Sequence, residues 1–208
     1  MLNYASINYL HLIIIISLSD LIIWFMKERI DITEVDPMDY VGDIIKAVYN
    51  GALITTMTNE KVNSMTISWG HIGIEWNKLI FIAYIRTGRH THKMLEESNE
   101  FTVNVGTKGE IGKTLSFCGT KSGATVDKIK ELGLNLVSAN KIKTPGIKEL
   151  PLTLECKLIY KQLQDKNAFS EEIKDKFYPS NKPSDFHGSN MDLHTMFYGE
   201  VVGAYIAK

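Results

Sequence analysis

After Gly51 the chain changes from a helical repeat of apolar residues to a succession of short segments rich in β-branched side chains. Residues 52–58 and 62–69 are two such segments, and the polar residues between them predict a β-hairpin. Further strands are predicted at residues 79–85, 101–105, 134–138, 152–162 and 196–207. Because helices do not alternate regularly with these strands, a small closed antiparallel barrel is favoured over a doubly wound parallel sheet.

Short helices are predicted between the hairpins. Asp39 is expected to cap the first helix, which ends at the stop signal Asn50–Gly51 and carries apolar residues at helical spacing, namely Val41, Ile44, Ile45 and Val48. Further helices are predicted at residues 91–98, 108–117 and 126–132. The sequence therefore predicts a mainly β protein with short helices.

The composition of the chain is that of one globular domain. Its 208 residues are 44% hydrophobic and 23% charged, which is enough to bury a single core. The net charge of −1 provides no basic field that could gather nucleic acid, so DNA or RNA binding is not expected. Cys118 and Cys156 are too few for a disulfide framework and show no metal-binding spacing, so a reducing cytoplasm is the expected location.

Near the N-terminus, residues 10–26 are almost wholly apolar and are followed by Lys27 and Arg29. With about seventeen residues, this segment is at the lower limit for a membrane-spanning helix, and Asp20 disfavours insertion. A signal peptide would have its positive charge before the apolar run and a small-residue cleavage site after it, and neither is present.

Three interpretations of the N-terminal segment therefore remain. It is an extension outside the functional domain, with Met26 as the natural start, or a membrane anchor, or a helix packed on the fold. We treat residues 1–25 as an apolar extension and residues 26–208 as the functional domain. Association with a membrane is expected only if the segment is a real anchor.

One long connection, residues 166–192, interrupts the pattern of strands. It is polar, contains two prolines, and holds a predicted helix at residues 171–177 that is opened by Ser170 and has acidic residues in its first turn. A connection of this length is commonly a lid or a partner-binding arm and less commonly an inert insertion. Both interpretations remain open.

Three polar and glycine-rich signatures follow one another in the central part of the chain. They are N-S-M-T-I-S-W-G (residues 63–70), R-T-G-R-H-T-H-K (86–93) and C-G-T-K-S-G-A-T-V-D-K (118–128). The first is typical of a strand, the second of a basic turn leading into a helix, and the third of a glycine-flanked loop before another helix. A flavin mononucleotide (FMN) needs three such elements, because it presents a phosphate dianion, a hydroxylated chain and an amphipathic ring.

Individual residues of these signatures suit individual parts of such a cofactor. The side chains that fit the phosphate are Arg86, Arg89, His90, Thr91 and Lys93. Thr91 lies where a helix is predicted to begin, and free N–H groups at such a point attract anions. Strand 63–69 offers an extended edge for the ring, and a third polar patch is formed by Lys121, Ser122 and Gly123.

On these motifs, together with E-F-T-V-N-V (residues 100–105) and H-T-M-F-Y-G-E-V (194–201), residues 36–208 resemble the flavin reductase-like family. The resemblance implies an antiparallel Greek-key split β-barrel of the FMN-binding type. It further implies a homodimer with non-covalent FMN at or near the subunit interface, and hydride or electron transfer through the flavin.

The resemblance also implies roles for single residues. Those that would line the ring and the ribityl chain are Asn63, Met65, Thr66, Ile67, Ser68 and Trp69. Arg89 and Thr91 would bind the phosphate, Lys121 and Ser122 the opposite edge, and His194 would face the nicotinamide side. One departure is that H-I-G-I-E-W-N (residues 71–77) stands where many members have a serine- and proline-rich loop, so Trp76 is expected to replace those contacts by packing.

Each assignment has a purely structural alternative. The basic residues 86–93 taken alone would be a solvated cluster, Trp69 a core residue, and His194 a strand histidine without a ligand. Cys118 is interpreted as a small buried hydrophobe rather than a redox thiol. His90 and His92 do not share a helix face, so no metal site is expected.

Three functional hypotheses follow from the sequence. The first is an enzyme in which NAD(P)H reduces bound FMN, which then reduces free flavin, a redox partner protein or another acceptor. The second is an FMN electron carrier that does not oxidise NAD(P)H itself. The third is a non-catalytic flavin- or haem-binding module.

Overall fold

The computed structural model describes residues 30–106, 111–186 and 188–208. The chain divides into two units, residues 1–31 and 32–208, and the second contains the elements described below. The predictions for the N-terminal extension lie outside the described residues, as does the start of the helix predicted at residues 108–117, whose described part is helical from Gly112. Within the described part of the chain, no helix has the length and hydropathy that a membrane span requires.

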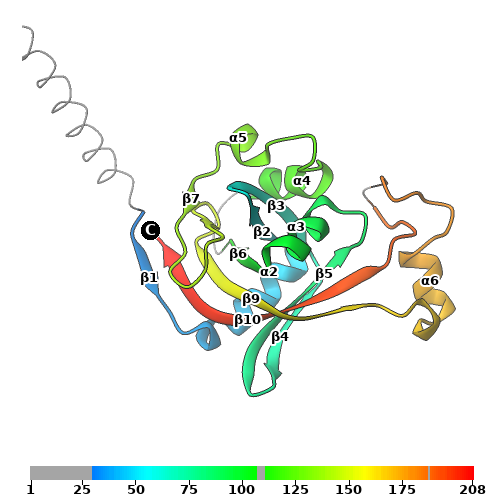
Figure 1. Cartoon of the computed structure of the whole chain (residues 1–208), viewed down its shortest axis with the longest axis horizontal. Coiled ribbons are helices and arrows are strands. Elements are labelled where there is room, and N and C mark those ends of the chain that lie inside the picture. The colour runs from blue at the N-terminus through cyan, green and yellow to red at the C-terminus, as the bar shows by residue number, and fades with distance from the viewer. Residues whose placement is uncertain (1–29, 107–110, 187) are drawn as a thin grey trace, which may run out of the picture. The chain divides into compact units, whose positions relative to one another are not determined.

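The second unit is built on one antiparallel sheet of eight strands in the order β3-β2-β6-β9-β10-β5-β4, with β1 added alongside β10 (Figure 1). The strands are β1 (Ile32–Glu34), β2 (Ala52–Thr58), β3 (Lys61–Ile67), β4 (Gly70–Glu75), β5 (Lys78–Arg86), β6 (Glu100–Val105), β9 (Leu152–Leu163) and β10 (His194–Ala207). A separate two-stranded sheet joins β7 (Leu136–Val137) to β8 (Gly146–Ile147). The predicted mainly β, antiparallel architecture is therefore confirmed.

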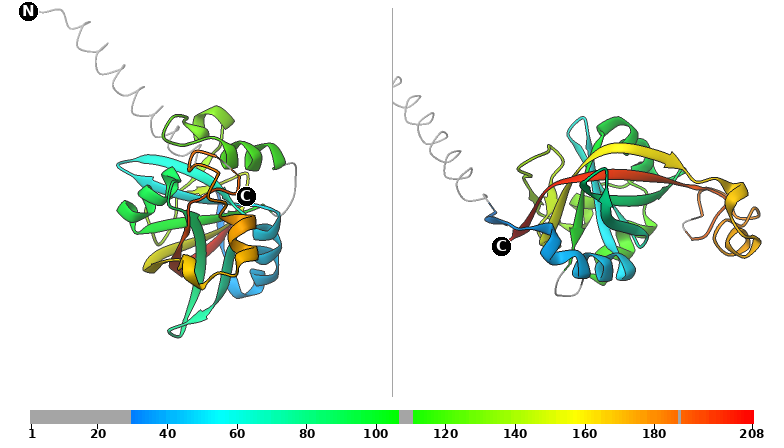
Figure 2. Two further views of the ribbon diagram at one scale, coloured as in Figure 1. Left: turned by 90° about the vertical axis from the view of Figure 1, so that its right-hand side faces the viewer. Right: turned by 90° about the horizontal axis from the view of Figure 1, so that it is seen from below.

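The sheet is curled, and its connectivity explains why. Strands β3 and β4 lie at opposite ends of the strand order, yet only Ser68 and Trp69 separate them along the chain. Three Cα–Cα steps, from Ile67 to Gly70, span at most about 11 Å, so the end of β3 and the start of β4 must come close together. Strand β3 does lie against β5, the neighbour of β4. The strongly bent ribbons of Figure 2 show the result.

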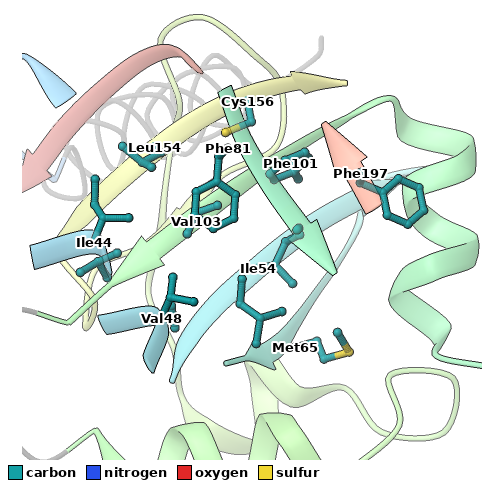
Figure 3. Close-up of a cluster of buried hydrophobic side chains, with 14 of the residues drawn as sticks. Ile44, Val48, Ile54, Met65, Phe81, Phe101, Val103, Leu154, Cys156 and Phe197 are labelled. Atoms are coloured by element: carbon teal, nitrogen blue, oxygen red, sulfur yellow. The ribbon is translucent and has the colours of Figure 1, made fainter. Parts of the chain in front are cut away.

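The apolar side chains of the strands point into the space that the curled sheet encloses. Figure 3 shows members of this core from distant parts of the chain, including Phe81 of β5, Phe101 of β6, Cys156 of β9 and Phe197 of β10, all fully buried. A second, smaller cluster lies outside the curled sheet and includes Cys118, so both cysteines are buried as free thiols, as expected. Burial of this kind is the main stabilising term of the fold.

Short helices connect the strands, and the helix in the long connection before β10 lies beyond the ends of β9 and β10, away from the curled sheet (Figure 1). The helices are the 3₁₀ helices η1 (Pro37–Tyr40) and η2 (Lys166–Ala168) and the α-helices α2 (Val41–Asn50), α3 (His90–Ser98), α4 (Gly112–Thr120), α5 (Lys128–Leu132) and α6 (Glu171–Phe177). The prediction that Asp39 caps the first helix was wrong. The carboxylate of Asp36 accepts the hydrogen bond from Met38 N–H at 2.9 Å, because a 3₁₀ turn precedes α2 and moves the cap upstream.

Strand β4 was not predicted from the sequence, because glycines interrupt its apolar residues. It forms a hairpin with β5 through Trp76 and Asn77, which have φ angles of 52° and 56°. Successive positive φ angles are typical of a type I′ turn, which matches the twist of the strands it joins. Trp76 packs against Tyr160 and Tyr198, with ring centroids 6.0 Å and 6.2 Å apart, and not against the cavity described below.

Candidate functional site

A cavity of about 220 Å³ lies where the ends of several elements meet, beside the junction between β3 and β4. It is lined by Met65, Thr66, Ile67, Ser68, Trp69, Tyr84, Arg86, Arg89, Gly119, Gly188 and His194. The first of these come from the end of β3, and the others come from β5, the turn before α3, the end of α4, the connection to β10, and the start of β10. Residues of all three sequence signatures therefore reach one cavity.

The three signatures meet at Asn63, which is 6% exposed. Its side-chain amide donates to the Thr91 hydroxyl at 2.9 Å, which joins β3 to the first turn of α3. Gly123 of the third signature lies against the same amide, because a Cβ atom at position 123 would overlap Asn63 Oδ1 and stand 3.0 Å from His90 Cδ2. Asn63 Oδ1 is buried and has no hydrogen-bond partner within the described residues. A buried acceptor of this kind is costly unless a ligand or water completes it.

The end of β3 forms one wall of the cavity, and its predicted contact with a flavin ring stays a prediction. Met65 and Ile67 are buried, whereas Ser68 and Trp69 are exposed and stand at its mouth. The Thr66 hydroxyl donates to Leu115 O at 2.6 Å, which fixes α4 against the strand. This wall is thus held in place by a neighbouring helix.

Arg86 is buried and serves the connection between β9 and β10. Its guanidinium donates to Phe177 O at 2.9 Å and to Asp192 O at 2.6 Å, and it also reaches the carbonyl and the side chain of Asn190. Direct strand pairing places it opposite His194. Arg86 therefore clamps the connection onto the site, and its predicted contact with a phosphate stays a prediction.

Arg89 lines the cavity at the turn before α3. Burial lowers the pKa of its guanidinium, and the nearby carboxylate of Asp192 acts in the opposite direction. A guanidinium keeps its charge under such a shift, so Arg89 presents a partly desolvated cation to the cavity. No side chain caps the N-terminus of α3 within the described residues, so its first backbone N–H groups remain suited to an anion.

The remaining predicted cofactor ligands, for the phosphate and for the opposite edge, differ in burial. His90 is half-buried, and burial followed by the nearby Lys128 and Lys93 lowers the pKa of its imidazole. Lys93, Lys121 and Ser122 are exposed, and the Ser122 hydroxyl accepts from Ala124 N–H at 3.3 Å within its own turn. These three side chains do not line the cavity, and their predicted contacts with a cofactor stay predictions.

His194 is buried at the start of β10 and its ring lines the cavity. The ring lies 4.6 Å from that of Trp69, and its Nδ1 atom lies 2.9 Å from the Tyr178 hydroxyl. Burial, followed by the charges of Arg86 and Arg89, lowers the pKa of its imidazole to about 3. His194 is therefore neutral at physiological pH and cannot act there as a cationic acid.

The long connection before β10 is part of the site. Helix α6 spans Glu171–Phe177 with Ser170 as its N-cap, as predicted. Phe177 meets the edge of Trp69 with ring centroids 5.3 Å apart, and Gly188 lines the cavity. Since this segment contributes to the cavity wall, the interpretation as an inert insertion is disfavoured.

Lys128 is a site residue to which sequence reasoning assigned no role, although the D-K pair at the end of the third signature contains it. It is 3% exposed, and its ammonium donates to Ser64 O at 2.6 Å and to Cys118 O at 3.1 Å. Burial lowers its pKa to about 8. The ammonium ties the edge strand β3 to the last turn of α4, where the glycine-flanked loop begins.

A second, more apolar cavity of about 420 Å³ shares Ser68, Trp69 and Tyr84 with the first. Its outer side is formed by Ile45 and Tyr49 of α2. Tyr84 was not singled out from the sequence, where it is one of several aromatic residues in a predicted strand. The two cavities meet at the mouth formed by Ser68 and Trp69.

Comparison with known proteins extends these observations. Residues 48–208 match the flavin reductase like domain family. An uncharacterized protein of Archaeoglobus fulgidus is 36% identical over 115 residues, which are 55% of this chain and 64% of the relative, so the match spans less than two thirds of that relative's length.

Solved structures with the same fold include flavoredoxin of Desulfovibrio vulgaris, with a TM-score of 0.57 and 20% identity over 76% of this chain and 69% of that chain. Another is an FMN-binding domain of a flavin reductases-like enzyme from Shewanella baltica, with a TM-score of 0.56 and 16% identity over 86% of this chain and 78% of that chain. These similarities confirm the predicted split-barrel fold class.

Proposed function

Because the chain belongs to the flavin reductase like domain family, we propose that it is an FMN-dependent oxidoreductase that accepts hydride from NAD(P)H. The observation that supports this proposal most directly is the convergence of the three signatures at Asn63, beside a cavity that contains Arg89 and His194. Bound FMN would supply the hydride and electron chemistry, while the protein would supply position, exclusion of water and electrostatics.

The residues present fit FMN. The wall formed by residues 65–69 would lie beside the ring, and the unpartnered Asn63 Oδ1 would accept from a ribityl hydroxyl. Arg89 and the first turn of α3 would bind the phosphate, with the loop of Lys121 and Ser122 opposite. A charge-assisted contact between a guanidinium and a phosphate is among the stronger hydrogen bonds in proteins.

The charges around the cavity suit a ring that becomes more negative when it is reduced. Arg86 and Arg89 line the cavity, and the Lys128 ammonium lies behind β3. Fixed positive charges in a partly desolvated site stabilise developing negative charge more than they would in water. His194 is neutral, so its expected contribution is a hydrogen bond or ring contact on the nicotinamide side.

The test is direct. Purified protein, or apoprotein titrated with FMN, is expected to show flavin absorbance bands, and a colourless folded sample that does not bind FMN at micromolar concentrations would overturn the proposal. Stopped-flow mixing of the FMN-loaded protein with NADH and with NADPH then measures bleaching of these bands. Bleaching within the turnover time supports the reductase.

An electron carrier is the second candidate, and the fold shared with flavoredoxin favours it. It requires FMN at the same site but no direct oxidation of NAD(P)H. A flavin that is stable to both nicotinamides but is reduced by a low-potential redox protein would identify the carrier. A flavin that reacts with no donor would instead identify a binding module.

We include a homodimer in the proposal and assign the exposed apolar face of η1 and α2 to its interface. Met38, Ile45 and Tyr49 are exposed there, Tyr49 by 85%, and the face continues through the apolar cavity to Trp69. A second copy of the chain would cover this surface next to the flavin. Light scattering is expected to give twice the mass of the chain, and Tyr49→Asp is expected to shift it toward the monomer; a monomeric wild type would contradict the assignment.

A further inference from the structure

Tyr178 of the long connection lies between His194 and Gln164, which directly follows β9. It is 4% exposed, and its hydroxyl oxygen lies 2.7 Å from Gln164 Oε1 and 2.9 Å from His194 Nδ1. Both distances are those of good hydrogen bonds. The three side chains therefore form a short chain of hydrogen bonds that ends at the cavity.

A count of hydrogens decides the direction of these bonds. The Gln164 amide presents its oxygen to Tyr178, and in this orientation it can only accept, while the Tyr178 hydroxyl carries a single hydrogen. Burial raises the pKa of Tyr178, so that hydrogen is present at physiological pH. Since the hydroxyl donates to Gln164, it can only accept from His194, and His194 Nδ1 must carry the hydrogen of the second bond.

This direction fixes the other ring nitrogen as well. A neutral imidazole has one N–H group, and His194 is neutral because its pKa is about 3. With the hydrogen on Nδ1, the Nε2 atom carries a lone pair and no hydrogen. Nε2 lies on the side of the ring away from Tyr178, and the ring lines the cavity beside Trp69.

The chain of hydrogen bonds is held firmly in place. Gln164 N–H donates to the backbone carbonyl of His194 at 3.0 Å, so the residue that orients the ring also holds the strand that carries it. Phe169 stacks on Tyr178 with centroids 5.0 Å apart and an interplanar angle of 9°. The Arg86 guanidinium lies 5.1 Å from the centroid of the Tyr178 ring. Such packing restricts the rotamers that could break the chain.

We propose that Tyr178 and Gln164 are positioning residues that hold His194 in the tautomer protonated on Nδ1, so that Nε2 offers the cavity a hydrogen-bond acceptor. The chemical group that this acceptor recognises is a neutral donor such as a carboxamide N–H. The assignment of this Nε2 acceptor to the carboxamide of a nicotinamide rests on the proposed function. The tautomer itself does not rest on it.

Nitrogen-15 NMR of the full chain tests the tautomer without any cofactor. The ring nitrogens of the six histidines are recorded at pH 7 through their long-range couplings to ring protons, and His194→Asn identifies the signals of His194. The expected pattern is a protonated Nδ1 and an unprotonated Nε2. A His194 signal with the hydrogen on Nε2, or a cationic ring, would overturn the proposal.

Two substitutions of Gln164 sharpen the test. Gln164→Glu keeps an acceptor that cannot donate, so the Nδ1-protonated tautomer is expected to persist. Gln164→Leu removes the acceptor and frees the Tyr178 hydroxyl to donate to His194 Nδ1, so the hydrogen is expected to move to Nε2. Tyr160→Phe is the matched control, because Tyr160 also donates to a glutamine, Gln162, at 3.2 Å but is exposed and does not contact His194. An unchanged tautomer in folded Gln164→Leu would contradict the assigned roles.

Steady-state kinetics separates this inference from the proposed function. If NADH is a substrate, Gln164→Leu is expected to raise its KM about tenfold with a smaller change in kcat, because the donor on Nε2 no longer matches the carboxamide. Gln164→Glu is expected to retain the wild-type KM. If NADH does not react at all, the proposed reductase fails while the NMR result still decides the tautomer.

Discussion

The ammonium of Lys128 donates to the backbone carbonyl of Ser64 at 2.6 Å, and so ties helix α5 to the strand that forms one wall of the cavity. A second bond to Cys118 O at 3.1 Å caps the last turn of α4. One buried cation thereby joins the neighbouring helices α4 and α5 to a strand 64 positions away in the sequence.

We therefore expect Lys128→Met to destabilise the protein by about 2 to 4 kcal/mol, since it leaves two buried carbonyl oxygens without a donor. Chemical denaturation of both proteins measures the free energy of unfolding. Lys130→Met, on the exposed side of the same helix, is the control and is expected to change stability by less than about 0.5 kcal/mol. Equal effects of the two substitutions would refute the cross-linking role.

The difference in stability between the wild type and Lys128→Met should depend on pH. The pKa of Lys128 is about 8 in the folded protein, below its ordinary value of 10.5, so between these values the unfolded chain binds more protons than the folded one. The stability of the wild type relative to the variant is therefore expected to rise from pH 8 to pH 10.5, by no more than about 3 kcal/mol. Denaturation of both proteins at pH 7, 8.5 and 10 measures this difference in the free energy of unfolding. A difference that decreases as the pH rises would contradict the prediction.

Acid is expected to destabilise the fold through His194. Its folded-state pKa of about 3 lies below its ordinary value of 6.5, so the unfolded chain gains a proton that the folded chain does not. Stability should fall as the pH is lowered from 6.5 toward 3, with a loss of about 3 kcal/mol from this group at pH 4. Between pH 4 and pH 7, the free energy of unfolding of His194→Gln should depend less on pH than that of the wild type. The same pH dependence in both proteins would show that His194 does not cause the loss of stability in acid.

Arg89→Ala should weaken FMN binding and leave riboflavin binding nearly unchanged, because riboflavin lacks the phosphate. Loss of a charge-assisted contact predicts about a ten- to hundredfold rise in the FMN dissociation constant. Quenching of flavin fluorescence measures both ligands. Lys157→Ala, an exposed cation on β9, is the control. An equal loss for riboflavin would place Arg89 at the ring or in the fold instead.

Gly123→Ala should displace the glycine-flanked loop from Asn63, since the new Cβ would overlap Asn63 Oδ1. We expect FMN affinity to fall about tenfold while the melting temperature changes little, because the loop is exposed. Gly112→Ala is the matched control, since a Cβ there has no atom within 4 Å among the described residues. Unchanged FMN affinity in Gly123→Ala would show that the third signature lies away from the ligand.

Some features of the fold were predictable because their causes are local. The hairpin of β2 and β3 follows from β-branched residues around a polar turn, and Ser170 opens α6 because its hydroxyl satisfies a free N–H group. Strand β4 was missed because its pairing with β5, and not its own composition, makes it a strand. The cap at Asp36 was missed because a 3₁₀ turn moved the start of the first helix.

The sequence by itself determined the kinds of residue available at the site, the strand-rich architecture and the family, since motifs and local periodicity are written along the chain. Only the tertiary structure decided that Arg86 clamps the connection, that Lys128 is buried between β3 and α4, and that Tyr178 reaches His194. These contacts join residues up to 106 positions apart. Curling of the sheet brings them together, and no local pattern records which distant partner will satisfy a buried polar group.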